Sequence, residues 1–271
     1  MKVFSLGTFK ELILRIAEDK KTRLVLALDV SVSLDRTNRD KWNRLKQDLL
    51  SRALKILEAT SDFLVAVKVN RHLVLPLGLY DLLPILIDEA KEDGLLLIMD
   101  AKLNDIGYSN WWIAHHYFNA GFDAIIANPF VGWKGGLDVV FEEAKKRKKG
   151  VLLLCYMSHP GAREGYGQYV IIDKNDQRVT RQYIIFAKRA LEWSADGVIV
   201  GATAPEIISE VKSIVSNECL IFSPGIGAQG GDPRTALGAG ADFLIVGRRI
   251  YMAQDPRKEA KRLYMEIAAL C

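Results

Sequence analysis

Three charged residues follow one another closely in the stretch Leu95 to Ile106, which reads LLLIMDAKLNDI. Asp100 ends a run of five apolar residues, Lys102 follows two positions later, and Asp105 three after that. A short apolar run of this kind predicts a strand that is buried on both faces, and side chains alternate along a strand, so Asp100 and Lys102 are expected on the same face. Buried charge is costly unless it is paired. From this stretch alone, a structural ion pair and a catalytic pair are both open interpretations.

Charged or polar residues also end other apolar runs. Asp29 ends RLVLALD, Lys68 lies near the end of FLVAVKVN, and Ser158 follows the run 150–157. Each has an ordinary explanation by itself: Lys68 could extend its ammonium into solvent, and Asp29 could bond to the turn that follows it. Four charges of alternating sign at the ends of three neighbouring strands are harder to explain as purely structural, and these are Asp29, Lys68, Asp100 and Lys102.

The elements that must position these residues alternate regularly along the chain. Eight apolar strands are expected at about 23–30, 63–70, 95–106, 122–128, 150–157, 197–202, 220–223 and 242–246. Helices are expected at about 35–59, 79–92, 109–120, 135–148 and 180–193, from Pro205, from Pro233 and at the C-terminal end. This alternation predicts an α/β fold, a (β/α)8 TIM barrel that forms a single domain over residues 1–271 with a short N-terminal amphipathic helix. An open doubly wound sheet would usually carry a glycine fingerprint after its first strand, where this chain has DVSVSLD.

The carboxyl ends of the strands of such a barrel form its active site, and phosphate groups often bind after the last two strands. PGIGAQGGD, residues 224–232, provides glycines that let backbone N–H groups approach an anion. Gly247-Arg248 follows the last strand and adds a guanidinium, although a surface salt bridge could also explain Arg248 alone. The two segments together predict a phosphorylated small molecule as ligand.

Composition excludes several other classes of protein. The net charge of the 271 residues is only +4, too small to indicate nucleic-acid binding, and the basic run Lys145 to Lys149 is expected to be a solvated helix end. No apolar run is long enough to span a membrane, and the first twenty residues lack the apolar segment of a signal peptide. Cys155 and Cys219 lie in strand-like runs and are expected to be buried free thiols. These features together predict a cytoplasmic protein.

The charged stretch resembles a known family. DAKLND fits the D-x-K-x-x-D motif of the orotidine 5'-phosphate decarboxylases, and five further segments are similar to that family in the same order: LALD, VKVN, MSHPGA, PGIGAQGGD and VGRRIY. The resemblance extends from about Leu24 to Tyr251. D-x-K-x-x-D alone is shared with relatives that decarboxylate or condense sugar phosphates with a metal ion, whereas SHPGA and PGIGAQGGD resemble the orotidine decarboxylase branch.

The resemblance implies decarboxylation of orotidine 5'-monophosphate to UMP and carbon dioxide, in pyrimidine biosynthesis, with no cofactor and no metal. It implies a catalytic array of Lys68, Asp100, Lys102 and Asp105. It also implies a homodimer in which Asp105 enters the partner subunit's site. The substrate-binding residues that it implies serve the ribose (Asp29, Lys68 and Ser109), the pyrimidine edge (Ser158) and the phosphate (Pro224, Gln229, Gly247 and Arg248). Ile106 is a further substrate-binding residue that the resemblance implies.

This chemistry needs these residue types. Loss of carbon dioxide leaves a carbanion, and a fixed ammonium at that carbon stabilises the developing charge more than the ground state, then donates the proton. Flanking carboxylates favour the charged form of Lys102 and crowd the substrate carboxylate. Remote binding of the phosphate can drive closure of loops over the site, and the loops after the fifth and seventh strands are expected to be those loops.

Two features depart from the family pattern. The family usually continues after Asp105-Ile106 with a proline and a threonine, where this chain has Gly107, Tyr108 and Ser109. The Gly-rich and polar stretch 159–178 is expected to be a long loop, and its part from Arg163 to Asp176 is longer than in compact members of the family. His115 and His116 lie on a predicted helix, where structural roles are expected.

Three alternatives stay open. A metal-dependent sugar-phosphate decarboxylase or aldolase of the same barrel group would need an acidic residue where Lys68 stands. A Schiff-base aldolase would use Lys102 as nucleophile, although a lysine held in its charged form is a poor one. A binding protein with an inactive site would bind UMP without turnover.

Overall fold

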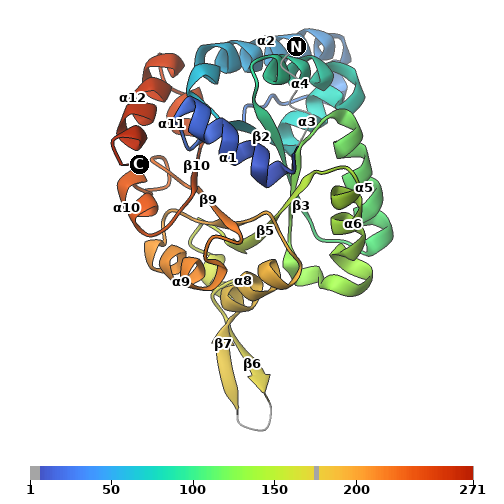
Figure 1. The fold of residues 1–271 in the computed structure, drawn as a ribbon. Coiled ribbons are helices and arrows are strands. Elements are labelled where there is room, and N and C mark those ends of the chain that lie inside the picture. The colour runs from blue at the N-terminus through green and yellow to red at the C-terminus, as the bar shows by residue number, and fades with distance from the viewer. Residues whose placement is uncertain (1–6, 174–176, 271) are drawn as a thin grey trace.

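Eight parallel strands close into a barrel in the computed structural model, which describes residues 7–173 and 177–270 (Figure 1). Around the barrel the strands follow the order β1-β10-β9-β8-β5-β4-β3-β2. Their bounds are β1 (Leu24–Leu28), β2 (Ala66–Asn70), β3 (Leu96–Leu103), β4 (Ala124–Ala127), β5 (Gly150–Tyr156), β8 (Gly197–Val200), β9 (Leu220–Pro224) and β10 (Phe243–Val246). The predicted (β/α)8 fold and all eight of its strands are confirmed.

Helices surround the barrel in Figure 1 and cover the outer faces of the strands. Because the inner faces pack on one another, every residue of β1, β4, β5, β8 and β10 is buried, as the uninterrupted apolar runs predict. The longer helices are α1 (Phe9–Lys20), α2 (Trp42–Thr60), α4 (Leu83–Glu92), α5 (Gly107–Ala120), α6 (Asp138–Lys146), α8 (Gln182–Glu192), α9 (Pro205–Val215) and α12 (Pro256–Ala268). The shorter ones are α3 (Arg71–Leu77), α7 (Ala162–Gly165), α10 (Pro233–Gly238) and α11 (Arg248–Tyr251), and the 3-10 and π turns are η1 (Arg36–Lys41), η2 (Ser61–Phe63), η3 (Gly78–Leu82), η4 (Pro129–Val131) and η5 (Trp133–Leu137).

Helix α1 lies across the amino-terminal end of the barrel (Figure 1). Thr8 caps it in a reciprocal pair with Glu11. Its first residue, Phe9, is buried and stacks on Phe222 of β9, which in turn stacks on Phe243 of β10. The predicted N-terminal helix is therefore confirmed from Phe9 onward, while residues 1–6 of that prediction lie outside the described residues.

The prediction for Cys155 and Cys219 is also met. Cys155 and Cys219 are buried free thiols, as expected. Cys271 lies outside the described residues. Over residues 7–173 and 177–270, no helix is both long enough and apolar enough to cross a membrane.

The prediction of one long loop at 159–178 is wrong. The segment contains α7 and then an antiparallel hairpin of β6 (Tyr169–Asp173) and β7 (Arg178–Arg181), which projects from the barrel in Figure 1. Val170, Ile171 and Val179 are β-branched, which favours strands, and Tyr169 lies directly opposite Arg181. The arginine side chain covers the tyrosine ring at 3.6 Å from its centroid.

The helix predicted at 79–92 is also incomplete. An additional helix, α3, begins directly after β2, where the side chain of Asn70 accepts a hydrogen bond from the N–H of His72. Pro76 and Gly78 end α3, and a π turn connects it to α4. The sequence pattern missed α3 because these two residues interrupt the helical spacing.

Candidate active site

The carboxyl ends of the barrel strands surround a cavity of about 250 Å³. Asp29, directly after β1, Lys68 of β2 and Asp100 and Lys102 of β3 contribute to its wall. Gln229 and Arg248 line it from the segments that follow β9 and β10. The fold therefore brings the predicted charged group and the predicted phosphate-binding segments to one cavity.

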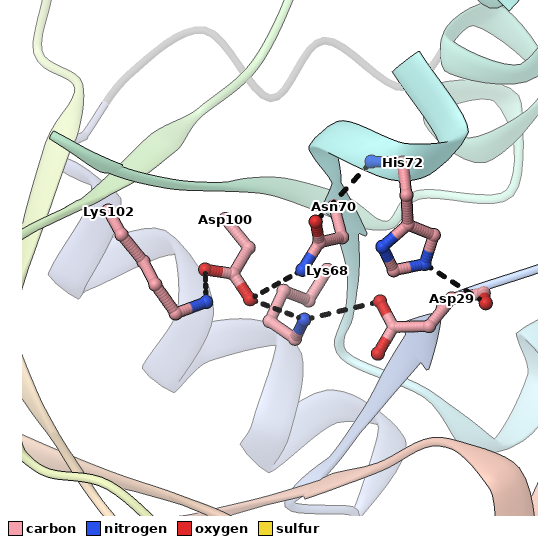
Figure 2. Close-up of polar contacts among 6 residues, drawn as sticks. All are labelled: Asp29, Lys68, Asn70, His72, Asp100 and Lys102. Atoms are coloured by element: carbon pink, nitrogen blue, oxygen red, sulfur yellow. Dashed lines mark hydrogen bonds and ion pairs between the residues drawn. The ribbon is translucent and has the colours of Figure 1, made fainter. Parts of the chain in front are cut away.

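The four charged residues at the carboxyl ends of β1 to β3 form a continuous chain of ion pairs, which we call the charged array (Figure 2). The ammonium of Lys68 lies 3.4 Å from Oδ1 of Asp29 and 2.8 Å from Oδ2 of Asp100. The other oxygen of Asp100, Oδ1, accepts from the ammonium of Lys102. Asp100 thus holds two ammonium groups, one on each carboxylate oxygen, and Lys102 is the outermost of them.

Burial and charge act against each other inside the array. Burial raises the pKa of Asp100, but the ammonium groups of Lys68 and Lys102 outweigh it and lower that pKa to about 2. Burial lowers the pKa of Lys68, but Asp100 and Asp29 outweigh it, so the pKa of Lys68 is raised. Both groups are therefore charged at neutral pH, although their side chains are only 7% exposed.

The backbone of β3 departs from a regular strand where it presents Lys102. The pairing with β4 shifts between Met99 and Leu103, and Lys102 has a φ of +49°, a conformation that few residues other than glycine adopt. The prediction that Asp100 and Lys102 point the same way is confirmed, but through a bulge. Backbone strain of this kind is often found at functional sites.

Two residues beside the array were missed by the sequence analysis. Asn70, the last residue of β2, lines the cavity and donates from Nδ2 to Oδ2 of Asp100 at 3.3 Å (Figure 2). Nε2 of His72 lies 3.1 Å from the carbonyl oxygen of Asp29. The sequence did carry a signal for Asn70. This polar residue directly follows Val67-Lys68-Val69 at the carboxyl end of the predicted strand, where active-site residues of a barrel are expected.

The segments after β9 and β10 have the backbone that an anion site needs. Gly225, Gly227 and Gly230 have positive φ values, and a Cβ on Gly225 would lie 2.9 Å from Oε1 of Gln229. Gly247 precedes the first turn of α11, whose first residue is Arg248. Arg248 makes no ion pair with a carboxylate among the described residues, so a surface salt bridge does not explain it. Pro224 and Ser158 line the same cavity.

Three predicted site residues do not line this cavity within one chain. They are Asp105, Ile106 and Ser109, which lie between β3 and the first turn of α5. The Asp105 carboxylate is exposed and accepts a hydrogen bond from the N–H of Ile106 at 2.7 Å. The Ile106 side chain is 65% exposed. These residues therefore form no part of the cavity wall of their own barrel.

The donor set of the cavity is mixed in charge. An ammonium lies between the two carboxylates of Asp29 and Asp100. Across the described residues, no three side chains of His, Cys, Asp or Glu gather in a way that could hold a metal ion. The array and Arg248 together offer three cationic groups to one cavity, which suits a substrate with more than one anionic group.

Comparisons with known proteins agree on one family. The family model "Orotidine 5'-phosphate decarboxylase / HUMPS family" matches residues 22–263. The orotidine 5'-phosphate decarboxylase of Thermococcus kodakarensis is 40% identical over 92% of this chain and 98% of its own length, and that of Methanosarcina barkeri is 37% identical over 93% and 97%. The crystal structure of the orotidine 5'-monophosphate decarboxylase of Methanocaldococcus jannaschii, complexed with the inhibitor BMP, matches with a TM-score of 0.73 at 32% identity, over 91% of this chain and 98% of that one.

Proposed function

The chain belongs to the orotidine 5'-phosphate decarboxylase / HUMPS family, and from this membership we propose how its residues divide the work of the reaction. The protein is an enzyme that decarboxylates orotidine 5'-monophosphate to UMP and carbon dioxide in pyrimidine biosynthesis. The roles proposed below rest on one observation, that the charged array lines the same cavity as Gln229 and Arg248.

The substrate phosphate binds at the segments after β9 and β10. Arg248 provides a guanidinium fork, and Gln229, Gly247 and Pro224 complete the pocket. Asp29 and Lys68 hold ribose hydroxyls, and Ser158 contacts the edge of the pyrimidine. This placement directs the substrate carboxylate toward Asp100 and Lys102.

Lys102 performs the proton transfer. The bond between C6 of the pyrimidine and the carboxylate carbon breaks, its electron pair stays on C6, and the ammonium of Lys102 donates a proton to that carbon. Carbon dioxide leaves, so the balance is one substrate and one proton to one UMP and one carbon dioxide. Asp100 fixes the Lys102 ammonium, and that fixed charge stabilises the carbanion without reorganisation in the transition state.

The site is completed by a second copy of the chain. Asp105 enters the array of the partner subunit in a homodimer, together with Ile106 and Ser109. The exposure of Asp105 and its absence from its own cavity support this arrangement. A single barrel domain and a cytoplasmic location complete the proposal, the latter because the free thiols of Cys155 and Cys219 are typical of reducing compartments.

The test follows the ultraviolet absorbance of orotidine 5'-monophosphate with wild-type protein, with Lys102→Ala, and with wild-type protein in a chelator. Loss of the orotate chromophore that persists in the chelator and falls at least about 10³-fold in Lys102→Ala is the expected result, since the variant lacks both the charge and the proton. No loss with folded wild-type protein would contradict the proposal. Activity abolished by the chelator would favour the metal-dependent alternative.

A further inference from the structure

A buried amide lies directly behind the exposed Asp105 segment. Asn110, in the first turn of α5, has an exposed fraction of 0%. Its own N–H bonds to the carbonyl of Ile106 at 2.9 Å, so helix α5 fixes its position relative to that segment. A fully buried amide needs hydrogen-bond partners for its oxygen and its nitrogen.

The Asn110 side chain bonds to both backbone groups of Asp105. Its Oδ1 accepts from the N–H of Asp105 at 3.2 Å, and its Nδ2 donates to the carbonyl oxygen of the same residue. Nδ2 also donates to the carbonyl oxygen of Gly136 at 3.0 Å. Only an amide of this length can accept one and donate two of these bonds, because aspartate has no donor and leucine has neither group.

Gly136 belongs to η5, in the connection after β4, so the amide joins two loops at the mouth of the barrel. The loops are in close contact at a second point, where a Cβ on Gly107 would lie 3.1 Å from the carbonyl oxygen of Gly135. Gly135 in turn donates its N–H to the carboxylate of Asp138 at 3.0 Å. Glycine at position 107 is thus explained by the approach of η5 to the start of α5.

We propose that Asn110 is a positioning residue that fixes the backbone of Asp105 for the active site of the partner subunit. The inference rests on the proposed function, in which Asp105 acts across a homodimer. The two bonds to Asp105 set where its backbone lies, and the bond to Gly136 anchors the amide to η5. A substitution at Asn110 therefore impairs the site in the other subunit and leaves the array of its own barrel intact.

The first expectation concerns homodimers of single variants. Asn110→Asp keeps an oxygen for the Asp105 N–H but presents a second oxygen to two carbonyl groups, and Asn110→Ala removes all three bonds. Either variant is expected to lower kcat/KM by roughly 10-fold to 100-fold, the size of effect that a misplacement of about 1 Å can have. Asn119→Ala is the matched control, because Asn119 lies on the same helix, is exposed, and bonds to Arg147 instead.

The decisive experiment uses hybrid dimers, which are made by co-expressing two differently tagged subunits and purifying through both tags. In a hybrid of Asn110→Asp with Lys102→Ala, the site that retains Lys102 receives its Asp105 segment from the subunit with an intact Asn110. One of its two sites is therefore fully built, and about half of the wild-type rate per dimer is expected. A hybrid of Asp105→Ala with Lys102→Ala should behave in the same way.

The outcomes separate the two proposals. If the Asp105→Ala hybrid is active and the Asn110→Asp hybrid is no better than the Asn110→Asp homodimer, Asn110 acts on its own barrel and the inference is overturned while the proposed function stands. If the Asp105→Ala hybrid is inactive, the transfer of Asp105 between subunits is overturned, and the inference with it. Should Asn110→Ala fail to fold, Asn110→Asp, which is nearly isosteric, carries the same comparison.

Discussion

At the scale of single residues, Asp100 is the centre of the site. Its two oxygens accept from Lys68, Lys102 and Asn70, and its side chain is 7% exposed. A carboxylate with this many donors has little freedom to rotate, so it holds the Lys102 ammonium at one place. The third donor, Asn70, carries no charge, which makes it possible to separate geometry from electrostatics by substitution.

Asn70→Ala should lower kcat/KM by about 10-fold and stability by about 2 kcal/mol, because Asp100 keeps both charged partners while the variant loses the bond to Asp100 and the cap of α3, each worth about 1 kcal/mol. The measurement is steady-state kinetics together with thermal unfolding. Asn128→Ala is the control. The side chain of Asn128 accepts from the N–H of Phe130, as that of Asn70 accepts from the N–H of His72, but Asn128 lies outside the cavity. Equal losses of activity in the two variants would show that the loss of a helix cap, and not the loss of the bond to Asp100, lowers activity.

The charged residues of the array could be predicted from sequence, whereas the contacts of the amides Asn70 and Asn110 could not. Asp29, Lys68, Asp100 and Lys102 interrupt or end apolar runs, so their type and position are informative. Asn70 ends the run FLVAVKVN, so its position was informative but its bond to Asp100 was not visible, and nothing around Asn110 in the sequence shows that it will be enclosed. Their partners, Asp100 and Gly136, come from other strands or loops, so only the folded chain shows the contacts.

At the scale of elements, an aspartate precedes each of the strands β4, β8 and β10 and bonds to the strand beside it. Asp123, Asp196 and Asp242 each precede a strand and accept from the N–H of the second residue of a neighbouring strand, at 3.0, 3.0 and 2.8 Å. Asp123 is paired with Lys149 and Asp242 with Lys212. Asp196 is more weakly compensated, and burial raises its pKa to about 6. Its charged form is therefore less favourable in the folded state than in the unfolded state.

Asp196→Asn should raise Tm by roughly 2–4 °C at pH 8, because the amide keeps an oxygen for Val151 and removes a buried charge. The folded pKa lies above the ordinary value of 3.8, so the stability contributed by Asp196 is greatest below about pH 4 and falls as the pH rises to about 6. The stability of Asp196→Asn should not show this decrease between pH 4 and pH 6. Thermal unfolding from pH 4 to pH 8 measures it, and Asp242→Asn, which loses an ion pair, should instead lower Tm at pH 8.

The hairpin of β6 and β7 lies where the sequence pattern predicts a loop. Its strands have only five and four residues, and they follow a Gly-rich stretch that is typical of loops. Tyr169, Ile171 and Val179 are 65%, 63% and 56% exposed, so the apolar residues that make it a hairpin are not part of the core. Local propensity, and not burial, accounts for these strands.

Replacing residues 170–180 by Asn-Gly should leave kcat and KM within about twofold of the wild type, because Tyr169 and Arg181 are directly paired and a two-residue turn can join them. The hairpin projects away from the barrel in Figure 1 and does not line the cavity. Steady-state kinetics on the shortened chain test this. A loss of more than tenfold would mean that the hairpin covers the substrate.

At the scale of the whole molecule, apolar residues are exposed beside Asp105. Ile106 and Tyr108, which flank Gly107, are 65% and 74% exposed. In the proposed homodimer Asp105 enters the other subunit, and exposed apolar groups beside it are expected at such an interface. The sequence could predict the barrel because it is built from local patterns, whereas the surface of the proposed dimer interface has no periodic signal in the sequence.

Ile106→Asp should separate the subunits and lower activity at the same time, because a charge at the interface is costly and each site then lacks the Asp105 of its partner. The wild type is expected to sediment at about 61 kDa, twice the 30.3 kDa of one chain, and the variant at the mass of one chain. Ile171→Asp is the matched control, since Ile171 is 63% exposed but lies on the hairpin. Its dimer and its activity should both be unchanged. If Ile106→Asp were monomeric and fully active, one barrel would be sufficient for catalysis, and Asp105 would have no role in a second subunit.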